Sequence, residues 1–391
     1  MNNYRIKTID KIDQNGLRFL GMAEVGNTMK DPDALIVRST KVDISQYPSV
    51  FAIARAGIGV DNIPVEQATR RGICVFNAPG SNSNAVAELV FAVLFSYARH
   101  TARSTAYVRS LLVANDEELT AQIEQGKNQF TGFELRGKTL GVVGLGNIGV
   151  LVANIGASLG MRVIGFDPHA TPRNMHRLRL DVEIVDSLNE LLRESDVITV
   201  HIPLLESTRG LIGTVELNEV KHACILLNYS RQGIYDDDAV LAALDAGTVA
   251  AYLTDFPTVK LLRHNQVILT PHLGSGTRDS QEKCAEMACR QLAHYITYGI
   301  IENSVNFPPM TQRPEKDIQS RLVVVNANVP RVIHGYTAAL EGFNIEAQVN
   351  LRSFDKTVAY NILDFSGIPS AATVQRVKDV EGVLHARLLQ F

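Results

Sequence analysis

Residues 140–149 read LGVVGLGNIG, and this stretch decides the fold of the chain around it. Gly144, Gly146 and Gly149 form a GxGxxG pattern that follows an apolar, strand-like run and opens a helical pattern. The first glycine permits a tight turn, the second lets the backbone approach a pyrophosphate, and the third lets the helix pack on the strand. Because a helix N-terminus presents free N–H groups to phosphates, the stretch predicts a dinucleotide-binding βαβ unit.

An acidic residue stands where such a unit needs one. Asp167 ends the next strand-like run, in GFDPH, eighteen residues after Gly149. A carboxylate there can accept hydrogen bonds from a ribose diol and would repel a 2′-phosphate, which favours NAD over NADP. A glycine-rich turn in an unrelated α/β protein is the alternative, but the strand, the helix and Asp167 all agree with the cofactor interpretation.

Short apolar runs alternate with helical patterns along most of the chain, which predicts an α/β fold with parallel sheets covered on both faces. The expected strands are 34–37, 49–54, 139–143, 162–166, 197–201, 224–228, 249–254 and 267–270. After a proline-rich stretch at 304–319 the pattern changes to βαββαβ, which is the ferredoxin-like arrangement. Its expected elements are strand 321–326, helix 330–341, strands 345–351 and 357–364, helix 371–379 and strand 385–390.

The composition excludes several classes of partner. The chain has 391 residues, a formal net charge of −3, 46% hydrophobic residues and 20% charged residues. This ordinary globular composition argues against a nucleic-acid or membrane surface, so an anionic substrate would be held by a few placed cations. The four cysteines form no CxxC pair and are expected to be reduced and structural in a cytoplasmic protein. No signal peptide, membrane span or metal site is expected.

Polar side chains stand where several of the expected strands end, and ligands of doubly wound sheets bind beyond those carboxyl ends. Arg231 can bind a carboxylate with its planar fork, although a surface ion pair is the alternative. His272 can take a proton near neutral pH, although a satisfied loop histidine is the alternative. Asp255 can accept a hydrogen bond from a nicotinamide carboxamide. For His201, a structural role in its loop and a cofactor contact are both open. Together these residues suit hydride transfer on a hydroxy acid.

These motifs resemble the signatures of the D-isomer-specific 2-hydroxyacid dehydrogenases. LGVVGLGNIG, followed after thirteen residues by VIGFD, is similar to that family's cofactor signature, and LLRESDVITVHIPLLESTRGLIG at 191–213 to its second signature. KHACILLNYSRQGIYDDDAV resembles the third, and PHLGSGT resembles the segment with the catalytic histidine. LIVRST, RAGIGVDNI and NAPGSNSNAVAELV also fit, so the resemblance covers nearly all of residues 34–308. NSVNFP and the C-terminal pattern are similar to the branch that acts on 3-phosphoglycerate and carries an ACT domain, an amino-acid-sensing module.

The resemblance implies a domain organisation and an assembly. A Rossmann-type NAD-binding domain at 96–276 would be inserted into a flavodoxin-like substrate-binding domain formed by 1–95 and 277–305. A linker at 306–319 and an ACT-like regulatory or assembly domain at 320–391 would follow. The family also implies a homodimer through the cofactor domains, with residues near 97–125 at the interface, or a homotetramer.

The resemblance assigns roles by position. Arg231 would bind the substrate carboxylate, and His272 would be the general acid/base. The residues expected to contact NAD are Gly144, Gly146, Asn147, Ile148, Gly149, Asp167, His201, Pro203, Tyr229, Ser230, Asp255, Gly274 and Ser275. The residues expected to contact the substrate are Gly57, Ile58 and Gly59 at its carboxylate, and Arg38 and Ser39 at its far end, where a phosphate would sit. For Arg38, a salt bridge within its own domain is the alternative.

Three positions depart from the family pattern, and the first, Gln232 in place of the usual glycine after Arg231, leaves the arginine side chain available. The family places a glutamate five residues after the aspartate equated with Asp255, and this chain has Lys260 there, as in a subgroup of the family. A cation beside His272 would lower the histidine pKa and could bind an anionic substrate, so Lys260 is expected to serve catalysis, with a solvated loop lysine as the alternative. Arg331 stands where glycine is common in serine-binding ACT domains. An amino-acid effector at this domain and a role in assembly alone are therefore both open.

The resemblance implies NAD-dependent oxidation of 3-phosphoglycerate to 3-phosphohydroxypyruvate, which is the first step of serine biosynthesis. Reduction of hydroxypyruvate or glyoxylate, or turnover of another D-2-hydroxy acid, is the alternative within the enzyme class. A non-catalytic protein that senses NAD or an amino acid on the same fold is the alternative outside it.

Overall fold

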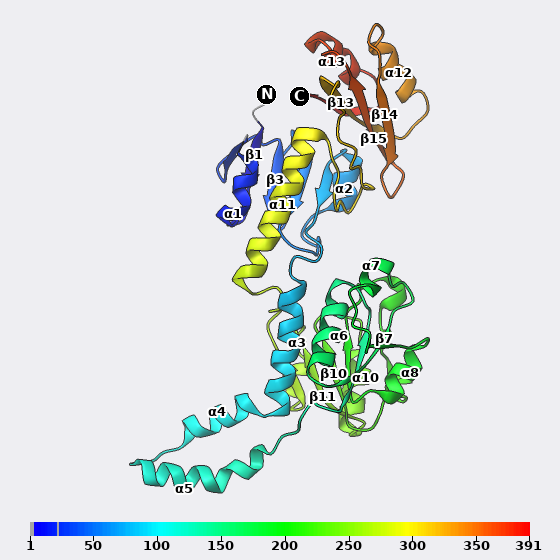
Figure 1. Ribbon diagram of the computed structural model, residues 1–391. Helices are drawn as coiled ribbons and strands as arrows, with labels where there is room; N and C mark the ends of the chain where they lie inside the picture. The colour runs from blue at the N-terminus through cyan, green and yellow to red at the C-terminus, as the bar shows by residue number, and fades with distance from the viewer. Residues whose placement is uncertain (1–3, 22) are drawn as a thin grey trace. The chain divides into compact units, whose positions relative to one another are not determined.

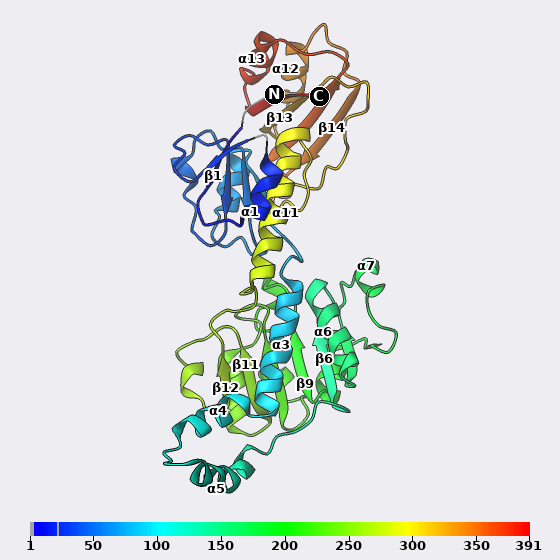
Figure 2. The ribbon, with the colours of Figure 1, turned by 60° about the vertical axis from the view of Figure 1, so that its left-hand side comes forward.

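The computed structural model describes residues 4–21 and 23–391. The chain forms two compact units, one made of Met1–Asn82 and Arg278–Phe391, the other of Ser83–Thr277 (Figures 1 and 2). The sequence-based boundary at residue 95 falls inside helix α3 (Ser83–Ala98), which the contacts assign entirely to the second unit. None of the helices in the described ranges is both long and apolar enough to cross a membrane.

The second unit is built on a seven-stranded parallel sheet in the order β12-β11-β10-β9-β6-β7-β8. Its strands are β6 (Thr139–Val143), β7 (Arg162–Phe166), β8 (Glu183–Ile184), β9 (Val197–Val200), β10 (Cys224–Asn228), β11 (Val249–Thr254) and β12 (Val267–Leu269). The order reverses between β6 and β9, which is the Rossmann arrangement with one strand added. Ligands of such sheets bind at this switch point, beyond the carboxyl ends of the strands.

Helices cover both faces of this sheet, as near-continuous apolar strands require. Residues of α3 and α6 (Asn147–Ser158) pack on one face. Residues of α8 (Leu188–Glu194), α9 (Thr214–Leu217) and α10 (Asp237–Asp245) pack on the other. The short helix α7 (Pro172–Met175) follows β7. Helices α4 (Thr101–Ser110) and α5 (Asp116–Gly126) form a hairpin that extends away from the sheet, and neither helix has a buried residue (Figure 1).

The first unit contains a five-stranded parallel sheet in the order β2-β1-β3-β4-β5. Its strands are β1 (Arg5–Thr8), β2 (Glu24–Gly26), β3 (Ala34–Val37), β4 (Ala52–Arg55) and β5 (Cys74–Phe76). This is the flavodoxin-like order that the sequence predicts. Helices α1 (Gln14–Leu17) and α11 (Arg278–Tyr298) contact each other, while α2 (Val65–Arg70) precedes β5 (Figure 1). The sequence did not predict β1, β2 or β5, because they are three or four residues long and charges interrupt the first two.

The C-terminal part of the first unit has the predicted ferredoxin-like topology. Its elements are β13 (Ser320–Ala327), α12 (Val332–Ala339), β14 (Ala347–Arg352), β15 (Val358–Phe365), α13 (Ala371–Lys378) and β16 (Val383–Gln390). The antiparallel sheet has the order β14-β15-β13-β16. One face packs on α12 and α13, and the other face joins the core of the five-stranded sheet. The predicted linker is docked as well, since Phe307 is buried and Met310 pairs with Ile301.

A buried ion pair ties this linker region to the C-terminal sheet. Arg321 and Asp364 lie opposite each other on β13 and β15, with side chains 0% and 2% exposed. The guanidinium donates to both carboxylate oxygens, at 2.6 and 2.8 Å, and its remaining nitrogen donates to the carbonyls of Tyr298 and Gln312. Because these groups satisfy one another, the pair can be buried without an uncompensated charge.

Candidate active site

The glycine loop follows β6 at the switch point of the seven-stranded sheet. Gly144 has a φ of +92°, and a Cβ there would lie 2.8 Å from the carbonyl oxygen of His201. A Cβ on Gly149 would lie 1.8 Å from the carbonyl oxygen of Gly144, so the helix can approach the strand only with glycine. A Cβ on Gly146 would meet nothing within 4 Å. The open space above Gly146, at the N-terminus of α6, fits a group that approaches the backbone as a pyrophosphate does.

Asp167 follows β7 and lies against this loop. One carboxylate oxygen accepts from the backbone N–H of Leu145 at 2.8 Å, and the other from that of His169 at 2.8 Å. The carboxylate is therefore fixed beside the glycine loop, as a ribose-binding residue requires. In the first turn of α6, half-buried Ile148 packs on the core, and the side-chain oxygen of Asn147 accepts from Arg177 at 3.1 Å.

The sequence did not single out Arg177, because its place beside Asn147 depends on a contact thirty residues apart in the chain. No local pattern marks an arginine in this position.

The loop after β9 holds His201 and Pro203. The His201 ring is buried, its Nε2 lies 3.0 Å from the Thr199 hydroxyl, and its Nδ1 has no hydrogen-bond partner. Burial lowers the pKa of His201 to about 3, so the imidazole is neutral. The carbonyl of Pro203 accepts from Thr208 at 2.7 Å, which fixes the loop. The ring thus has a partner on the preceding strand, and its Nδ1 remains without one.

Three predicted residues follow β10 in sequence. Tyr229 is buried, and burial raises its pKa, so the phenol stays protonated. Ser230 donates its hydroxyl proton to the carbonyl of Ile202, which joins the loops after β9 and β10. Arg231 is half-buried and donates from Nη1 to the carbonyl of Ser230 at 2.8 Å. In the part of the chain that the structure describes, no carboxylate forms an ion pair with Arg231, so its fork remains available to an anion.

Asp255 holds the loop that carries His272. The carboxylate is 2% exposed and accepts from the Thr270 hydroxyl at 2.7 Å and from the backbone N–H groups of Leu273 and Gly274 at 2.8 Å each. These three hydrogen bonds bracket His272, whose φ is +54°, a strained value for a residue other than glycine. Asp255 thus fixes the loop that carries His272, a role that the sequence around Asp255 does not indicate.

The His272 side chain itself is exposed. Its ring lies edge-on to Phe256, with ring centroids 5.3 Å apart. Ser275, next in the loop, is also exposed. An exposed imidazole on a fixed loop is able to exchange a proton with a bound molecule.

Lys260 lies on the loop after β11 and is bound by an acid that the sequence analysis did not consider. Its ammonium group lies 2.6 and 2.8 Å from the two carboxylate oxygens of Asp238 on α10. The hydrogen bond and the charge of Asp238 raise the pKa of Lys260. The lysine side chain is 61% exposed. Lys260 therefore stays a cation, but the structure shows its charge shared with Asp238.

The predicted substrate residues lie in the first unit, at the carboxyl ends of β3 and β4. The backbone N–H groups of Arg38 and Ser39 donate to Asp10, at 2.6 and 3.0 Å, and Arg38 Nη1 donates to the side chain of Gln281 at 3.2 Å. The salt-bridge alternative for Arg38 finds no carboxylate partner among the described residues. A Cβ on Gly57 would overlap the guanidinium of Arg55, so any other residue would require that side chain to move.

The segment after Gly57 is fixed by its neighbours. The carbonyl of Gly57 accepts from the Ala78 backbone at 2.8 Å, and that of Ile58 accepts from the side chain of Asn77 at 2.7 Å. Gly59 follows in the same loop, and this loop lies at the carboxyl end of β4. Each unit thus presents its predicted residues at the edge of its own sheet where ligands of α/β folds bind.

Known proteins share these motifs. Residues 91–274 match the family model described as "D-isomer specific 2-hydroxyacid dehydrogenase, NAD binding domain". A D-3-phosphoglycerate dehydrogenase of Methanocaldococcus jannaschii is 37% identical over 74% of this chain and 54% of its own length. A second, from Haemophilus influenzae, is 30% identical over 94% and 88%. A glyoxylate reductase of Thermococcus litoralis is 35% identical over 73% and 87%. The chain thus spans only about half the length of the first of these relatives.

Solved structures agree with the fold. The NAD⁺-bound 3-phosphoglycerate dehydrogenase of Entamoeba histolytica is 27% identical, covers 78% of this chain and 99% of its own, and superimposes with a TM-score of 0.61. The second unit carries the glycine loop, the fixed Asp167 and the family's NAD-binding model, and it is an NAD-binding domain. The chain belongs to the family of D-isomer-specific 2-hydroxyacid dehydrogenases.

Proposed function

We propose that this protein oxidises 3-phosphoglycerate to 3-phosphohydroxypyruvate with NAD, as the first step of serine biosynthesis. The observation that carries the proposal is the pair formed by Arg231 and His272. An arginine fork with no carboxylate partner among the described residues and an exposed imidazole on a fixed loop follow two strands of the sheet that bears the glycine loop. These are the groups that a hydroxy-acid dehydrogenase needs.

The chain's residues divide the work as follows. Arg231 binds the substrate carboxylate with two parallel N–H donors and so orients C2. His272 accepts the proton of the C2 hydroxyl as the carbonyl forms, and it returns that proton in the reverse reaction. Asp255 keeps the His272 loop in place through its three hydrogen bonds. The nicotinamide, when bound, supplies the acceptor for the hydride that leaves C2.

A steady-state assay of NADH formation with 3-phosphoglycerate tests this assignment. His272→Asn keeps a polar side chain but cannot take the proton, so kcat should fall by about 10²- to 10⁴-fold while the Kd for NAD changes little. His222→Asn, at an exposed site remote in sequence, is the control. If the natural chain binds NAD yet turns over no 2-hydroxy or 2-keto acid, a sensor function replaces the enzymatic one.

The substrate could instead be hydroxypyruvate or glyoxylate, and the Thermococcus litoralis relative favours that alternative. Phosphate recognition separates the two. We infer that Arg38 contacts the phosphate, because its guanidinium is held at the end of β3 by a neutral partner, Gln281. Arg38→Ala should raise KM for 3-phosphoglycerate at least tenfold more than KM for D-glycerate, whereas exposed Lys41→Ala should change neither. Equal losses on both substrates would contradict a phosphate contact.

We also propose an ACT-type role for the ferredoxin-like domain. Its strand order supports this. Arg331 has a φ of +73°, a conformation that favours glycine, but an arginine opposes the close backbone approach that glycine would allow, so an effector role and an assembly role both stay open. Calorimetric titration of the full chain with small amino acids tests an effector role. Heat of binding that is lost in Arg331→Glu would support an effector, and no heat with any amino acid would leave assembly as the function.

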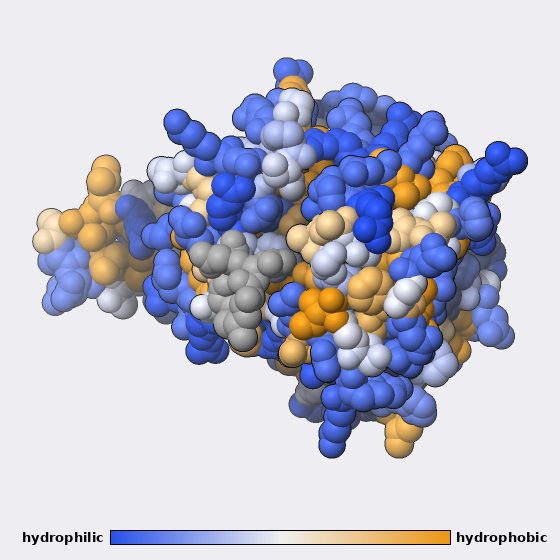
Figure 3. Space-filling model, turned by 90° about the horizontal axis from the view of Figure 1, so that it is seen from above, coloured by the Kyte–Doolittle hydropathy of each residue, from blue (hydrophilic) through white to orange (hydrophobic). Residues whose placement is uncertain are grey.

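We further propose that the α4–α5 hairpin joins two copies of the chain. Residues 111–115, between the two helices, read LLVAN, and Leu112 is 93% exposed. Figure 3 shows apolar side chains on this projection, at the left of the view. A projecting hairpin with exposed apolar residues and no buried one needs a partner surface.

A further inference from the structure

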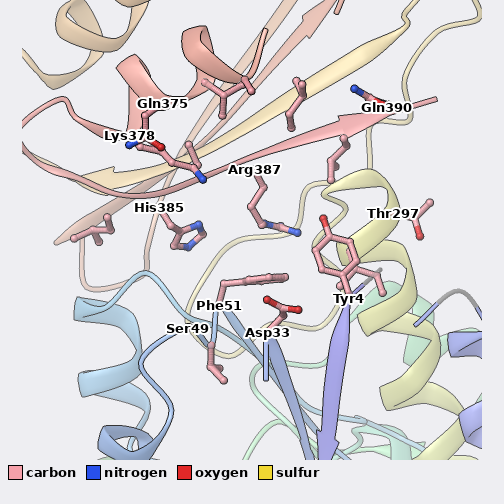
Figure 4. Close-up of a pocket in the computed structure, with 18 of the residues that line it drawn as sticks. Tyr4, Asp33, Ser49, Phe51, Thr297, Gln375, Lys378, His385, Arg387 and Gln390 are labelled. Carbon is pink, nitrogen blue, oxygen red and sulfur yellow. The ribbon is translucent and has the colours of Figure 1, made fainter. Parts of the chain in front are cut away.

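A cavity in the first unit lies between the five-stranded sheet and the C-terminal sheet, outside the candidate active site. Its volume is about 1160 Å³, and its walls come from the start of β1, the segment before β4, the end of α11, α13 and β16 (Figure 4). That volume is enough for a metabolite-sized molecule. The catalytic residues proposed above lie in the other unit, so this cavity has no part in the reaction as described.

Arg387 on β16 points into this cavity. The side chain is only 9% exposed, and its guanidinium lies over the rings of Phe51 at 4.0 Å and Tyr295 at 4.6 Å from the ring centroids. Its Nε, Nη1 and Nη2 atoms meet no acceptor in good hydrogen-bond geometry, although the hydroxyls of Tyr4 and Tyr295 lie near enough to interact with the guanidinium. No carboxylate among the described residues forms an ion pair with it. Arg321, the other buried arginine of this sheet, by contrast donates four hydrogen bonds, two of them to the Asp364 carboxylate.

The carboxylate of Asp33, which could otherwise pair with Arg387, already interacts with Arg5. Asp33 lines the same cavity, but its carboxylate accepts from the backbone N–H of Arg5 at 2.8 Å and lies 3.9 Å from the Arg5 side chain. Contacts with the two aromatic rings favour a cation, but neither they nor the neighbouring tyrosine hydroxyls supply a negative charge to Arg387. A buried guanidinium without an anionic partner is costly, because it has lost its hydrating water and gained no opposite charge.

His385 supplies a second unused group beside Arg387. The two residues are two apart on β16, so their side chains leave the same face of the strand. His385 Nε2 lies 2.9 Å from the carbonyl oxygen of Gly72 and must donate to it, which leaves Nδ1 as a bare acceptor. Burial lowers the pKa of His385 to about 4 and keeps the ring neutral. Nδ1 is buried without a partner, and the hydroxyls of Tyr4 and Tyr295 lie beside the Arg387 guanidinium.

We propose that this cavity binds a small metabolite through a carboxylate or phosphate group held by the fork of Arg387. The planar guanidinium matches two oxygens of either group. A tyrosine hydroxyl can donate to the same oxyanion, and His385 Nδ1 can accept a hydrogen bond from an N–H or O–H elsewhere on the ligand. The occupied site would join β16 to the sheet domain, because its walls come from both.

Thermal unfolding of the full chain tests the site, with sodium phosphate, sodium acetate and glycine as probes at constant ionic strength. At least one probe should raise the Tm in a saturable way. Arg387→Met preserves length and can pack on both rings, so we expect a folded chain whose apparent Kd for that probe rises at least about tenfold. The exposed Arg352→Met on β14 is the matched control and should retain the natural Kd.

Two further measurements separate this site from the active site and from a purely structural arginine. Arg231→Met should keep the saturable stabilisation, since it removes only the proposed catalytic cation. Arg387→Met without any probe should be at least as stable as the natural chain, because a buried unpaired charge is gone. No saturable response to any probe, an unchanged Kd in Arg387→Met, or a large loss of Tm in that variant alone would each overturn the proposal. A response to phosphate but not to acetate or glycine would identify a phosphate group, and the converse a carboxylate.

Discussion

For Lys260, the sequence pattern and the structure indicate different neighbours. The chain pattern puts it near His272, where a cation would favour the neutral imidazole. The structure pairs its ammonium group with Asp238. Lys260 is exposed, so Asp238 and solvent both screen its charge. Whether Lys260 assists His272 thus depends on how strongly its screened charge still acts on the imidazole.

A pH profile answers that question. If Lys260 acts on His272, Lys260→Met removes a cation and should shift the acid limb of kcat/KM to higher pH. Asp238→Asn frees the cation and should shift the same limb to lower pH. Both shifts should be below about one pH unit, since the pair is exposed. Profiles that coincide for all three proteins, with unchanged kcat and KM, would remove Lys260 from the mechanism.

The glycine loop allows a sharp test at the scale of an element. A Cβ on Gly149 would collide with the Gly144 carbonyl, whereas a Cβ on Gly146 would enter open space. Gly149→Ala should therefore lower the free energy of unfolding by about 1–3 kcal/mol, as overpacking does. Gly146→Ala should leave unfolding nearly unchanged and raise the Kd for NAD. Thermal unfolding and an NAD titration on both variants check this, and the prediction fails if the two variants behave alike.

The α4–α5 hairpin carries the second prediction at this scale. Leu112→Glu places a charge at the tip of the hairpin and should convert an oligomer into a monomer, as measured by light scattering after size-exclusion chromatography. Leu180→Glu is the matched control, because Leu180 is a fully exposed leucine of the same unit outside the hairpin. A natural chain that already elutes as a monomer, or an oligomer that survives Leu112→Glu, would rule out the hairpin as the interface.

Two buried histidines contribute to the pH dependence of the stability of the whole molecule. Burial lowers the pKa of His201 to about 3 and that of His385 to about 4, while an unfolded histidine titrates near 6.5. Below about pH 6.5 these two histidines therefore bind protons in the unfolded chain but not in the folded chain. The free energy of unfolding thus falls as the pH falls toward 4. Each histidine contributes up to about 1.4 kcal/mol per pH unit.

Urea unfolding at several pH values between 4 and 7 measures this slope. His385→Gln should make it shallower, whereas exposed His222→Gln should leave it unchanged. A slope that His385→Gln does not alter would mean that the ring is protonated in the folded chain.

The sequence by itself determined the features that depend on local chemistry. The glycine spacing, the acid after the second strand and the apolar runs are local, so they predicted the βαβ unit, the strands on either side of the switch point and the ferredoxin-like topology. The short strands β1 and β2 were not predicted, because their charged residues break the apolar run that marks the equally short β3.

Only the tertiary structure decided which distant groups meet. It bonded Asp255 to the His272 loop, paired Lys260 with Asp238, and put Arg387 against Phe51 in a cavity of the first unit. These contacts join residues separated by up to hundreds of positions, and their geometry follows from how sheets and helices pack. The same GxGxxG that opened the sequence thus fixed the cofactor domain, while packing determined the partners of the residues around it.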